Sequence, residues 1–178
     1  MHRIVASVTT LAQHLLLLAE EPERYRPAVC PHCGVAKPSR HGYYERKAVR
    51  SIALAVASDP IPVPRFRCRG CSRTCSRLPA CLAPRRWYGW EAQQVLLLWL
   101  SAGGSLRAAA GHCKIDQHTA RRWRDWLVQR GELFAFYLRS RFADWGRAPD
   151  MTQFWRTTLV ERSLQTLMAW LDRDLVVP

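Results

Sequence analysis

Long apolar runs are missing from this 178-residue sequence, and their absence limits where the protein can work. No stretch reaches the roughly 20 apolar residues that a membrane-spanning helix needs, which excludes an integral membrane protein. The run of leucines at residues 15–18 leads into an acidic segment without a clear cleavage site, so it is a poor export signal. We therefore expect a cytoplasmic protein whose cysteine thiols stay reduced.

Lysine is scarce, and acidic residues are few compared with basic ones. The chain has 3 lysines and 24 arginines, and its 27 basic residues against 14 acidic ones give a formal charge of +13. Such an excess indicates a polyanionic partner. Arginine suits bidentate contacts with phosphate and guanine, although codon usage in a GC-rich genome explains the preference over lysine equally well.

The positive charge is unevenly distributed along the chain. Residues 1–83 carry a net charge of +8 and residues 84–130 a net charge of +5, whereas residues 131–178 have a net charge of zero. We expect the first two segments to bind the anion. The last segment needs another explanation.

Four of the seven cysteines form two Cys-x-x-Cys pairs, Cys30 with Cys33 and Cys68 with Cys71. Such a turn brings two thiolates together, and a glycine at or just after it supplies the positive φ that the turn needs. Four thiolates form a closed tetrahedral zinc site with bonds of about 2.3 Å. The sequence therefore predicts one structural zinc ion and, because no coordination position is open, no zinc catalysis.

Other uses of the cysteines and nearby histidines are weaker. A redox Cys-x-x-Cys motif opens a helix after a strand and needs one copy, whereas this proline-rich segment has two. Cys75 and Cys81 lie close enough to replace a ligand or join a second site, and His32 and His41 are also near. We expect each of these four to be a packing or solvated residue, and Cys113 to fill a small buried site.

Residues 25–83 are rich in proline, arginine and cysteine, and are expected to form a small zinc-ribbon β domain. Strands are expected at residues 42–44, 52–54 and 63–67. Three prolines confine the last of these to an edge position or make it irregular: Pro60, Pro62 and Pro64. Residues 1–24 are expected to contain a short helix, capped by Thr9 or Thr10, that ends near Glu21.

Helical patterns dominate from Trp87 onward. We expect a helix over residues 88–101 that stops at Gly103-Gly104, and a short helix over residues 106–112 capped by Ser105. A third helix is expected over residues 118–130, capped by Asp116 and closed by Gly131. Further helices are expected over residues 133–145 and 151–172.

Residues 105–127 have the pattern of a helix-turn-helix. Ala120, Trp123 and Leu127 share one face of the longer helix. The opposite face, together with Gln117 in the first turn, carries side chains that read base edges and phosphates in the major groove: His118, Arg121, Arg122, Asp125 and Gln129. Other arginines are better placed for contacts with the DNA backbone: Arg107, Arg124 and Arg130. The alternative is an ordinary helical hairpin with a solvated charged face.

These expectations add up to an α+β fold in which a small zinc-ribbon β domain precedes a helical domain. The expected divisions are an N-terminal helix in residues 1–24, the zinc ribbon in residues 25–83, the helix-turn-helix domain in residues 84–131, and C-terminal helices in residues 132–178.

The order of the motifs resembles a known family. Cys30-Pro-His-Cys-Gly, His41-Gly-Tyr-Tyr-Glu-Arg, and Arg-Phe-Arg-Cys-Arg-Gly-Cys-Ser-Arg-Thr-Cys-Ser-Arg-Leu-Pro at residues 65–79 resemble the zinc ribbon of bacterial insertion-sequence transposases. The tryptophan-rich helix and residues 105–126 look like the helix-turn-helix that follows in those proteins. The resemblance covers about residues 25–130. In that family the two modules bind the terminal repeats of the element, which implies double-stranded DNA as the partner.

The catalytic half of such transposases has no counterpart in this sequence. The family carries a ribonuclease-H-like domain with three metal-binding carboxylates, which needs a central sheet and more than about 100 residues. About 48 residues follow residue 130, and their acids lie on segments with helical patterns: Glu132, Asp144, Asp150, Glu161, Asp172 and Asp174. We expect a sequence-specific, nucleoid-associated DNA-binding protein that is not an enzyme by itself.

Two other functions stay open at the level of the sequence. The chain could be the DNA-targeting subunit of a split transposase that acts with a separate nuclease, or a zinc-ribbon adaptor for RNA or protein. A neighbouring reading frame that encodes a carboxylate-bearing nuclease would favour the first. Binding to structured RNA over duplex DNA would favour the second.

The neutral last segment ends in an apolar stripe at helical spacing, formed by Val160, Leu164, Leu167, Met168 and Leu171. Such a stripe must be covered. Either it packs on the chain's own residues 4–20, or it forms a homodimer through residues 132–178. A dimer would pair two recognition helices on a two-fold DNA site.

Overall fold

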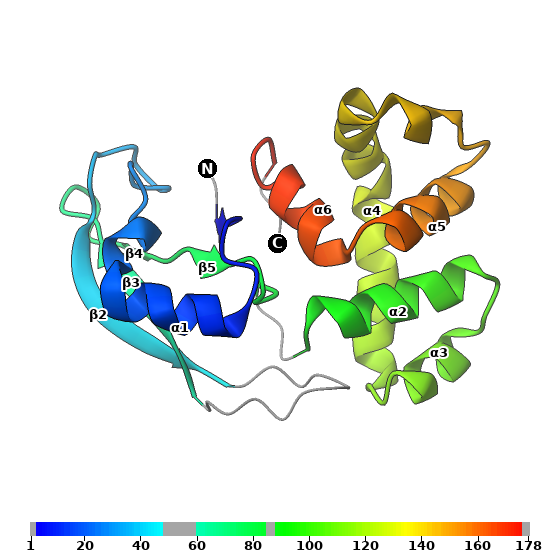
Figure 1. Ribbon diagram of the computed structural model, residues 1–178, viewed down its shortest axis with the longest axis horizontal. Coiled ribbons are helices and arrows are strands. Elements are labelled where there is room, and N and C mark those ends of the chain that lie inside the picture. The colour runs from blue at the N-terminus through cyan, green and yellow to red at the C-terminus, as the bar shows by residue number, and fades with distance from the viewer. Residues whose placement is uncertain (1–2, 48–59, 85–87, 176–178) are drawn as a thin grey trace.

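The computed structural model describes residues 3–47, 60–84 and 88–175. It confirms the α+β expectation, with small sheets in the N-terminal half followed by helices (Figure 1). Figure 1 shows the sheets and α1 on one side and the bundle of α2 to α6 on the other. No helix of the described residues is long and apolar enough to cross a membrane.

The N-terminal segment begins with β1 (Ile4–Val5), which the sequence patterns did not predict. The expected helix follows as α1 (Leu11–Glu20), and Thr10 caps it in a reciprocal capping box with Gln13. The helix ends where predicted, because Pro22 opens the short 3-10 helix η1 (Pro22–Tyr25).

The ribbon sheet has the antiparallel order β2-β3-β4, formed by β2 (Ser39–Arg46), β3 (Ile61–Arg67) and β4 (Thr74–Cys75). Two of the expected strands fall in β2 and β3, and the expected strand at residues 52–54 lies outside the described residues. β3 is the middle strand, yet among the described residues β4 pairs only with Phe66 and Arg67 of it. Pro62 and Pro64 therefore lie in a stretch with β2 on one side only, as expected for an edge. The carbonyl of Pro62 accepts a hydrogen bond from Nε2 of buried His14 at 2.9 Å.

A second sheet joins the two halves of the molecule. β1 pairs in parallel with β5 (Leu78–Pro79), and the carboxylate of Asp172 accepts a hydrogen bond from the Ile4 amide at 2.8 Å. The indole of Trp90 donates to the carbonyl of Ala80 at 2.8 Å. Asp172, which follows α6, and β5, which precedes α2, are thus both hydrogen-bonded to the N-terminal strand β1.

The first helices of the helical half follow the expected pattern. α2 (Trp90–Ser101) ends before Gly103, α3 (Leu106–His112) is capped by Ser105, and α4 (Gln117–Arg141) is capped by Asp116. The remaining elements are η2 (Ala143–Arg147), α5 (Met151–Glu161) and α6 (Leu164–Leu171).

Two expected helix boundaries are wrong. Gly131 does not close α4 but is buried inside it. A Cβ at this position would lie 3.0 Å from Nε1 of Trp155. This glycine lets α5 approach α4 closely, and the expected division between residues 131 and 132 falls inside one helix. The helix expected over residues 151–172 is also interrupted, because Ser163 starts α6 by capping the amide of Thr166.

The apolar stripe of the last segment is covered within the chain. Leu164, Leu167, Met168 and Leu171 are at most 1% exposed, and they lie in one cluster with Ile4 and with residues of α2, α4 and α5. Leu17, the buried apolar residue of α1, belongs to a separate, smaller cluster. The predicted intramolecular packing therefore involves the helical core and Ile4 rather than α1, while Val160 stays 71% exposed.

Candidate functional site

The first Cys-x-x-Cys turn is held by backbone hydrogen bonds around Cys30. The Cys30 amide donates to the carbonyl of Val35 at 2.8 Å, and the Gly34 amide donates to the carbonyl of Cys30 at 2.9 Å. Gly34 has φ +75°, as the sequence predicted for the residue after the turn. The amide of His32 lies 3.4 Å from Sγ of Cys30 and points toward it. The turn thus presents amides to the sulfur, as metal-binding turns do.

The second turn uses its glycine differently from the first. The residue with positive φ is Ser72, at 56°, and not Gly70. A Cβ on Gly70 would lie 2.8 Å from Cγ2 of Val35 and 3.6 Å from Sγ of Cys33. Gly70 therefore allows the two turns to approach each other, and its amide lies 3.3 Å from Sγ of Cys68.

The fold brings the four predicted ligands together. The sulfurs of Cys30, Cys33, Cys68 and Cys71 all lie within 4.8 Å of one another. Two of the sulfur pairs are 3.7 Å and 3.5 Å apart, Cys30 with Cys71 and Cys33 with Cys68. Four bonds of about 2.3 Å in tetrahedral geometry place sulfurs roughly 3.7 Å apart, so the cluster fits one metal ion.

The thiols of this cluster shift one another's pKa through their hydrogen bonds. The backbone hydrogen bond from Cys71 lowers the pKa of Cys68 to about 7, and the Cys33 thiol contributes in the same direction. For Cys33, the backbone hydrogen bond with Val35 lowers the pKa, but the hydrogen bond with Cys68 and burial outweigh it and raise the pKa to about 12. A metal ion would replace the thiol protons, which couples its binding to pH.

The other cysteines and the nearby histidines stay outside this cluster. In the part of the chain that the structure describes, no other group of histidine, cysteine or acidic side chains could hold a metal ion. Cys75 packs beside Phe66, and burial raises its pKa. Burial also raises the pKa of Cys81 to about 11. His32 and His41 are exposed, and Cys113 is 2% exposed in the helical core.

The second candidate site is the unit formed by α3 and α4. The amide of Ala108 donates to the Ser105 hydroxyl at 3.2 Å, and the Asp116 carboxylate accepts from the amides of His118 and Thr119. Ala109 and Ala110 are fully buried, which lets the helices approach closely, and Ile115 is 8% exposed in the turn. These features match the expected helix-turn-helix pattern.

α4 has the two faces that the sequence predicted. Ala120 and Trp123 are buried, and Trp123 packs edge-on against Tyr88 with ring centroids 5.7 Å apart. All of the predicted contact residues except Asp125 and Arg130 are exposed, namely Gln117, His118, Arg121, Arg122, Arg124 and Gln129 on α4, and Arg107 on α3. Asp125 is half-buried and accepts hydrogen bonds from Nε and Nη2 of exposed Arg124 at 2.9 and 2.8 Å. Arg130 is partly buried, and its guanidinium lies 5.3 Å from the ring centroid of Phe134.

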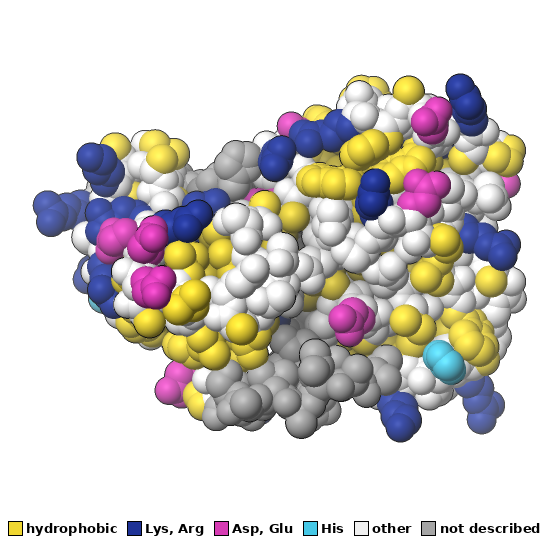
Figure 2. Space-filling view, in the orientation of Figure 1, with side chains coloured by type: hydrophobic (Ala, Val, Ile, Leu, Met, Phe, Trp, Pro, Cys, Tyr) yellow, Lys and Arg dark blue, Asp and Glu magenta, His cyan; other side chains and the backbone are white. Residues whose placement is uncertain are grey.

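Basic side chains gather over both halves of the molecule. In Figure 2 they crowd the outer end of the sheet half and also project below the region of α3. On the ribbon, the guanidinium of Arg40 lies 5.2 Å from the ring centroid of Tyr43, and that of Arg65 lies 5.2 Å from the ring centroid of Tyr44. Positive charge thus lies on the ribbon strands as well as around α4.

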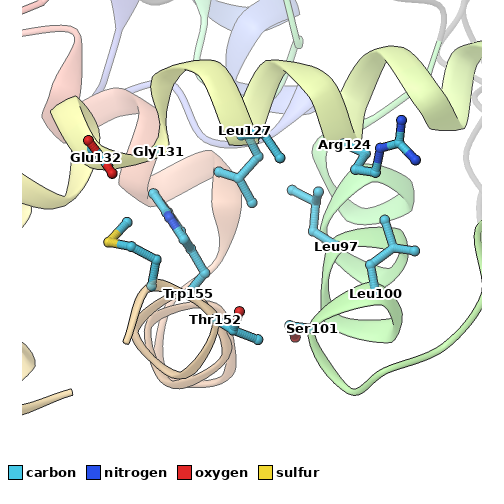
Figure 3. A pocket seen from close by; sticks show the side chains of 11 residues that line it. Leu97, Leu100, Ser101, Arg124, Leu127, Gly131, Glu132, Thr152 and Trp155 are labelled. Carbon is cyan, nitrogen blue, oxygen red and sulfur yellow. The ribbon is translucent and has the colours of Figure 1, made fainter. Parts of the chain in front are cut away.

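A cavity of about 370 Å³ lies among α2, α4 and α5 (Figure 3). Leu97, Leu100, Leu127 and Trp155 form much of its wall, and Arg124 and Glu132 are its charged lining residues. Its walls therefore extend the apolar helical core, and its charged side chains come from α4.

Two features near these sites could not be predicted from the sequence. Lys114, in the turn between α3 and α4, has φ 52°. Such a value for a lysine has no sequence signal, because glycine is the residue that marks this conformation. Gly70 was identified, but its role in the contact between the two turns depends on Val35, which lies 35 residues earlier.

Comparison with known proteins places the described sites within a family. No curated protein and no solved structure matches the chain. One family model, described as a domain of unknown function (DUF6431), matches residues 30–123. The match begins at the first cysteine of the cluster and ends in α4, so it spans the cysteine cluster, α2 and α3. Since it covers more than half of the sequence, the chain belongs to the DUF6431 family.

Proposed function

We propose that this protein is a sequence-specific DNA-binding protein whose ribbon is stabilised by one structural zinc ion. The observation that carries the proposal is the α3–α4 unit, with a buried inner face and an exposed outer face bearing Gln117, His118, Arg121 and Arg122. These side chains suit base edges and phosphates. The formal charge of +13 supplies the long-range attraction to a polyanion.

Zinc is the metal that the donor set favours. Four thiolates are soft ligands, and their spacing in the structure suits a closed tetrahedral site. Zinc bound there would fix the two turns to each other and supply no catalysis, because all four positions belong to the protein. The side chains of Arg40, Arg65 and Arg67 on the ribbon strands would then be held in place for phosphate contacts.

The relationship to transposase DNA-recognition modules and the nucleoid location are parts of the same proposal. They are supported by the motif order that resembles insertion-sequence transposases, and by the presence of a four-cysteine cluster and a basic helical unit in the same chain. A homodimer through residues 132–178 is also proposed. Because the stripe on α6 is buried, the contacts between the two protomers would come from the exposed Leu133, Phe136 and Val160.

Selection of bound sequences from a random pool of DNA duplexes tests the proposed function. The zinc-loaded protein is incubated with the pool in the presence of structured RNA as competitor. We expect enrichment of a defined duplex motif. Preferential recovery of the RNA would instead support an adaptor that uses the ribbon as a scaffold, and recovery without an enriched motif would contradict sequence-specific binding.

We also propose that the chain has no nuclease activity alone, and that any cleavage needs a separate subunit. The described residues 131–175 contain helices and no strand, so their carboxylates have no sheet to hold them as a ribonuclease-H-like site would. Purified protein incubated with duplex DNA and Mg²⁺ or Mn²⁺ should leave the strands intact on a denaturing gel. Cleavage that persists through purification to homogeneity would overturn this expectation.

A further inference from the structure

Lys114 occupies a backbone position that favours glycine. It follows α3 with φ 52°, and its amide donates to the carbonyl of Gly111 at 3.1 Å. The amide of Ile115 donates to the carbonyl of Ala110 at 3.0 Å. This pair of bonds defines a Schellman motif, in which the residue at the place of Lys114 is usually glycine. The side chain of Lys114 therefore strains the turn.

The surrounding fold gives no reason for a lysine at this place. Its side chain is exposed, and within residues 3–47, 60–84 and 88–175 it has no hydrogen bond, ion pair or ring contact. The nearest acid in sequence, Asp116, uses its carboxylate to cap the amides of His118 and Thr119. At the end of another helix, α2, the chain uses Gly103 for a left-handed conformation, whereas Lys37 and Ser72 adopt it in the ribbon. Stability alone would favour glycine at position 114 as well.

The place of Lys114 relative to α4 suggests what it does. It lies three residues before Gln117, the first residue of α4, and the N-terminal end of a helix attracts anions. The exposed side chains of Gln117 and His118 follow in the first turn. A lysine ammonium is a compact charge that binds a phosphate oxygen without demanding a fixed geometry.

We propose that Lys114 contacts a DNA backbone phosphate and positions the N-terminal end of α4 on the duplex, and that the strained turn is retained for this contact. The inference rests on the proposed DNA-binding function and adds a residue to it. Strain that the fold itself does not use is typical of functional sites. Phosphate contacts of this kind set the register of a recognition helix and carry no base information.

The variant Lys114→Gly separates stability from binding. Glycine relaxes the turn, so the midpoint of thermal unfolding should rise. Loss of one phosphate contact should lower affinity for duplex DNA about 5- to 10-fold near 0.1 M salt, by the same factor for a selected site and for an unrelated duplex. The slope of log K against log salt concentration should become shallower by about 0.9. Lys114→Arg, which keeps both the charge and the strain, should retain the slope and the unfolding midpoint.

Each contrary result has a distinct meaning. A Lys114→Gly protein that is more stable yet binds DNA with unchanged affinity and slope would overturn the phosphate contact. A Lys114→Gly protein that is less stable than the unmodified protein would show that Lys114 does not strain the turn, and the proposal would lose its basis. If the unmodified zinc-loaded protein shows no salt-dependent binding to duplex DNA, the proposed function fails, and the inference fails with it.

Discussion

At the scale of single residues, glycines in the metal cluster have two different roles. The sequence predicted that a glycine at or after each turn supplies a positive φ, and this is confirmed at Gly34. At the second turn the prediction is wrong, because Ser72 has the positive φ and Gly70 instead makes room for Val35. A conformational preference belongs to one residue and its neighbours, whereas a steric contact with a distant residue leaves no local signal.

Gly70→Ala tests this steric role. The added methyl group would lie 2.8 Å from Cγ2 of Val35, a stiff β-branched side chain, so the two turns must move apart. We expect the metal-loaded protein to lose roughly 1–3 kcal/mol of stability, as overpacked sites do. Thermal unfolding followed by circular dichroism measures the change.

Gly111→Ala is the matched control for that variant. A Cβ at Gly111 meets nothing within 4 Å, and the residue lies in α3, where alanine is favoured over glycine by about 0.5–1 kcal/mol. The control should therefore stabilise the protein. Equal unfolding midpoints for the two variants would show that Gly70 has no packing role.

At the scale of elements, the predicted helix caps are confirmed, whereas the predicted end of the third helix is wrong. Ser105 and Asp116 cap α3 and α4 as expected, because a cap depends on a side chain and amides two or three residues away. The end of α4 was missed because Gly131 looks like a stop signal, while its surroundings, set by Trp155 of α5, keep it inside the helix. The central position of β3 was not predicted either. It depends on a short pairing with β4, which no pattern in residues 60–67 indicates.

The arginines on the outer face of α4 and beside it fall into two predicted classes, those that read a base and those that contact phosphates. Arg121→Ala or Arg122→Ala should weaken binding to the selected DNA site by roughly 1–3 kcal/mol if the side chain reads a base. Arg107→Ala or Arg124→Ala should weaken binding to all duplexes alike, since phosphate contacts are independent of sequence. Fluorescence anisotropy with a selected and an unrelated duplex distinguishes the two classes. Identical behaviour of both pairs would show that the assignment of the helix faces is wrong.

At the scale of the whole molecule, we expect the sheet half to depend on the cysteine cluster more than the helical half does. The buried cluster of the helical half includes Trp90, Phe134 and Leu164, whereas those of the sheet half are small and centre on Tyr25 and Ile61. A small domain with so little core needs a further constraint. The sequence indicated this division. It did not indicate the Ile4–Asp172 contact, which joins residues 168 positions apart.

Removal of the metal should therefore unfold the ribbon. Native mass spectrometry should find one zinc per chain, and Cys30→Ser or Cys71→Ser should release it and unfold residues 25–83. The helical half should keep its structure, which far-ultraviolet circular dichroism would report. Cys75→Ser, a cysteine outside the cluster, is the control and should keep one zinc. Full zinc occupancy in the double variant Cys30→Ser/Cys71→Ser would contradict the assigned ligands.

The most direct test of the account is the affinity of the zinc-loaded full chain for duplex DNA as a function of salt. With +13 formal charge and exposed arginines on both α3 and α4, we expect several phosphate contacts. Between about 50 and 200 mM salt, log K should fall with log salt concentration with a slope steeper than roughly −3, since each contact adds about −0.9. The selected duplex should stay tighter than an unrelated one throughout. A shallow slope together with equal affinity for both duplexes would contradict a DNA-binding function.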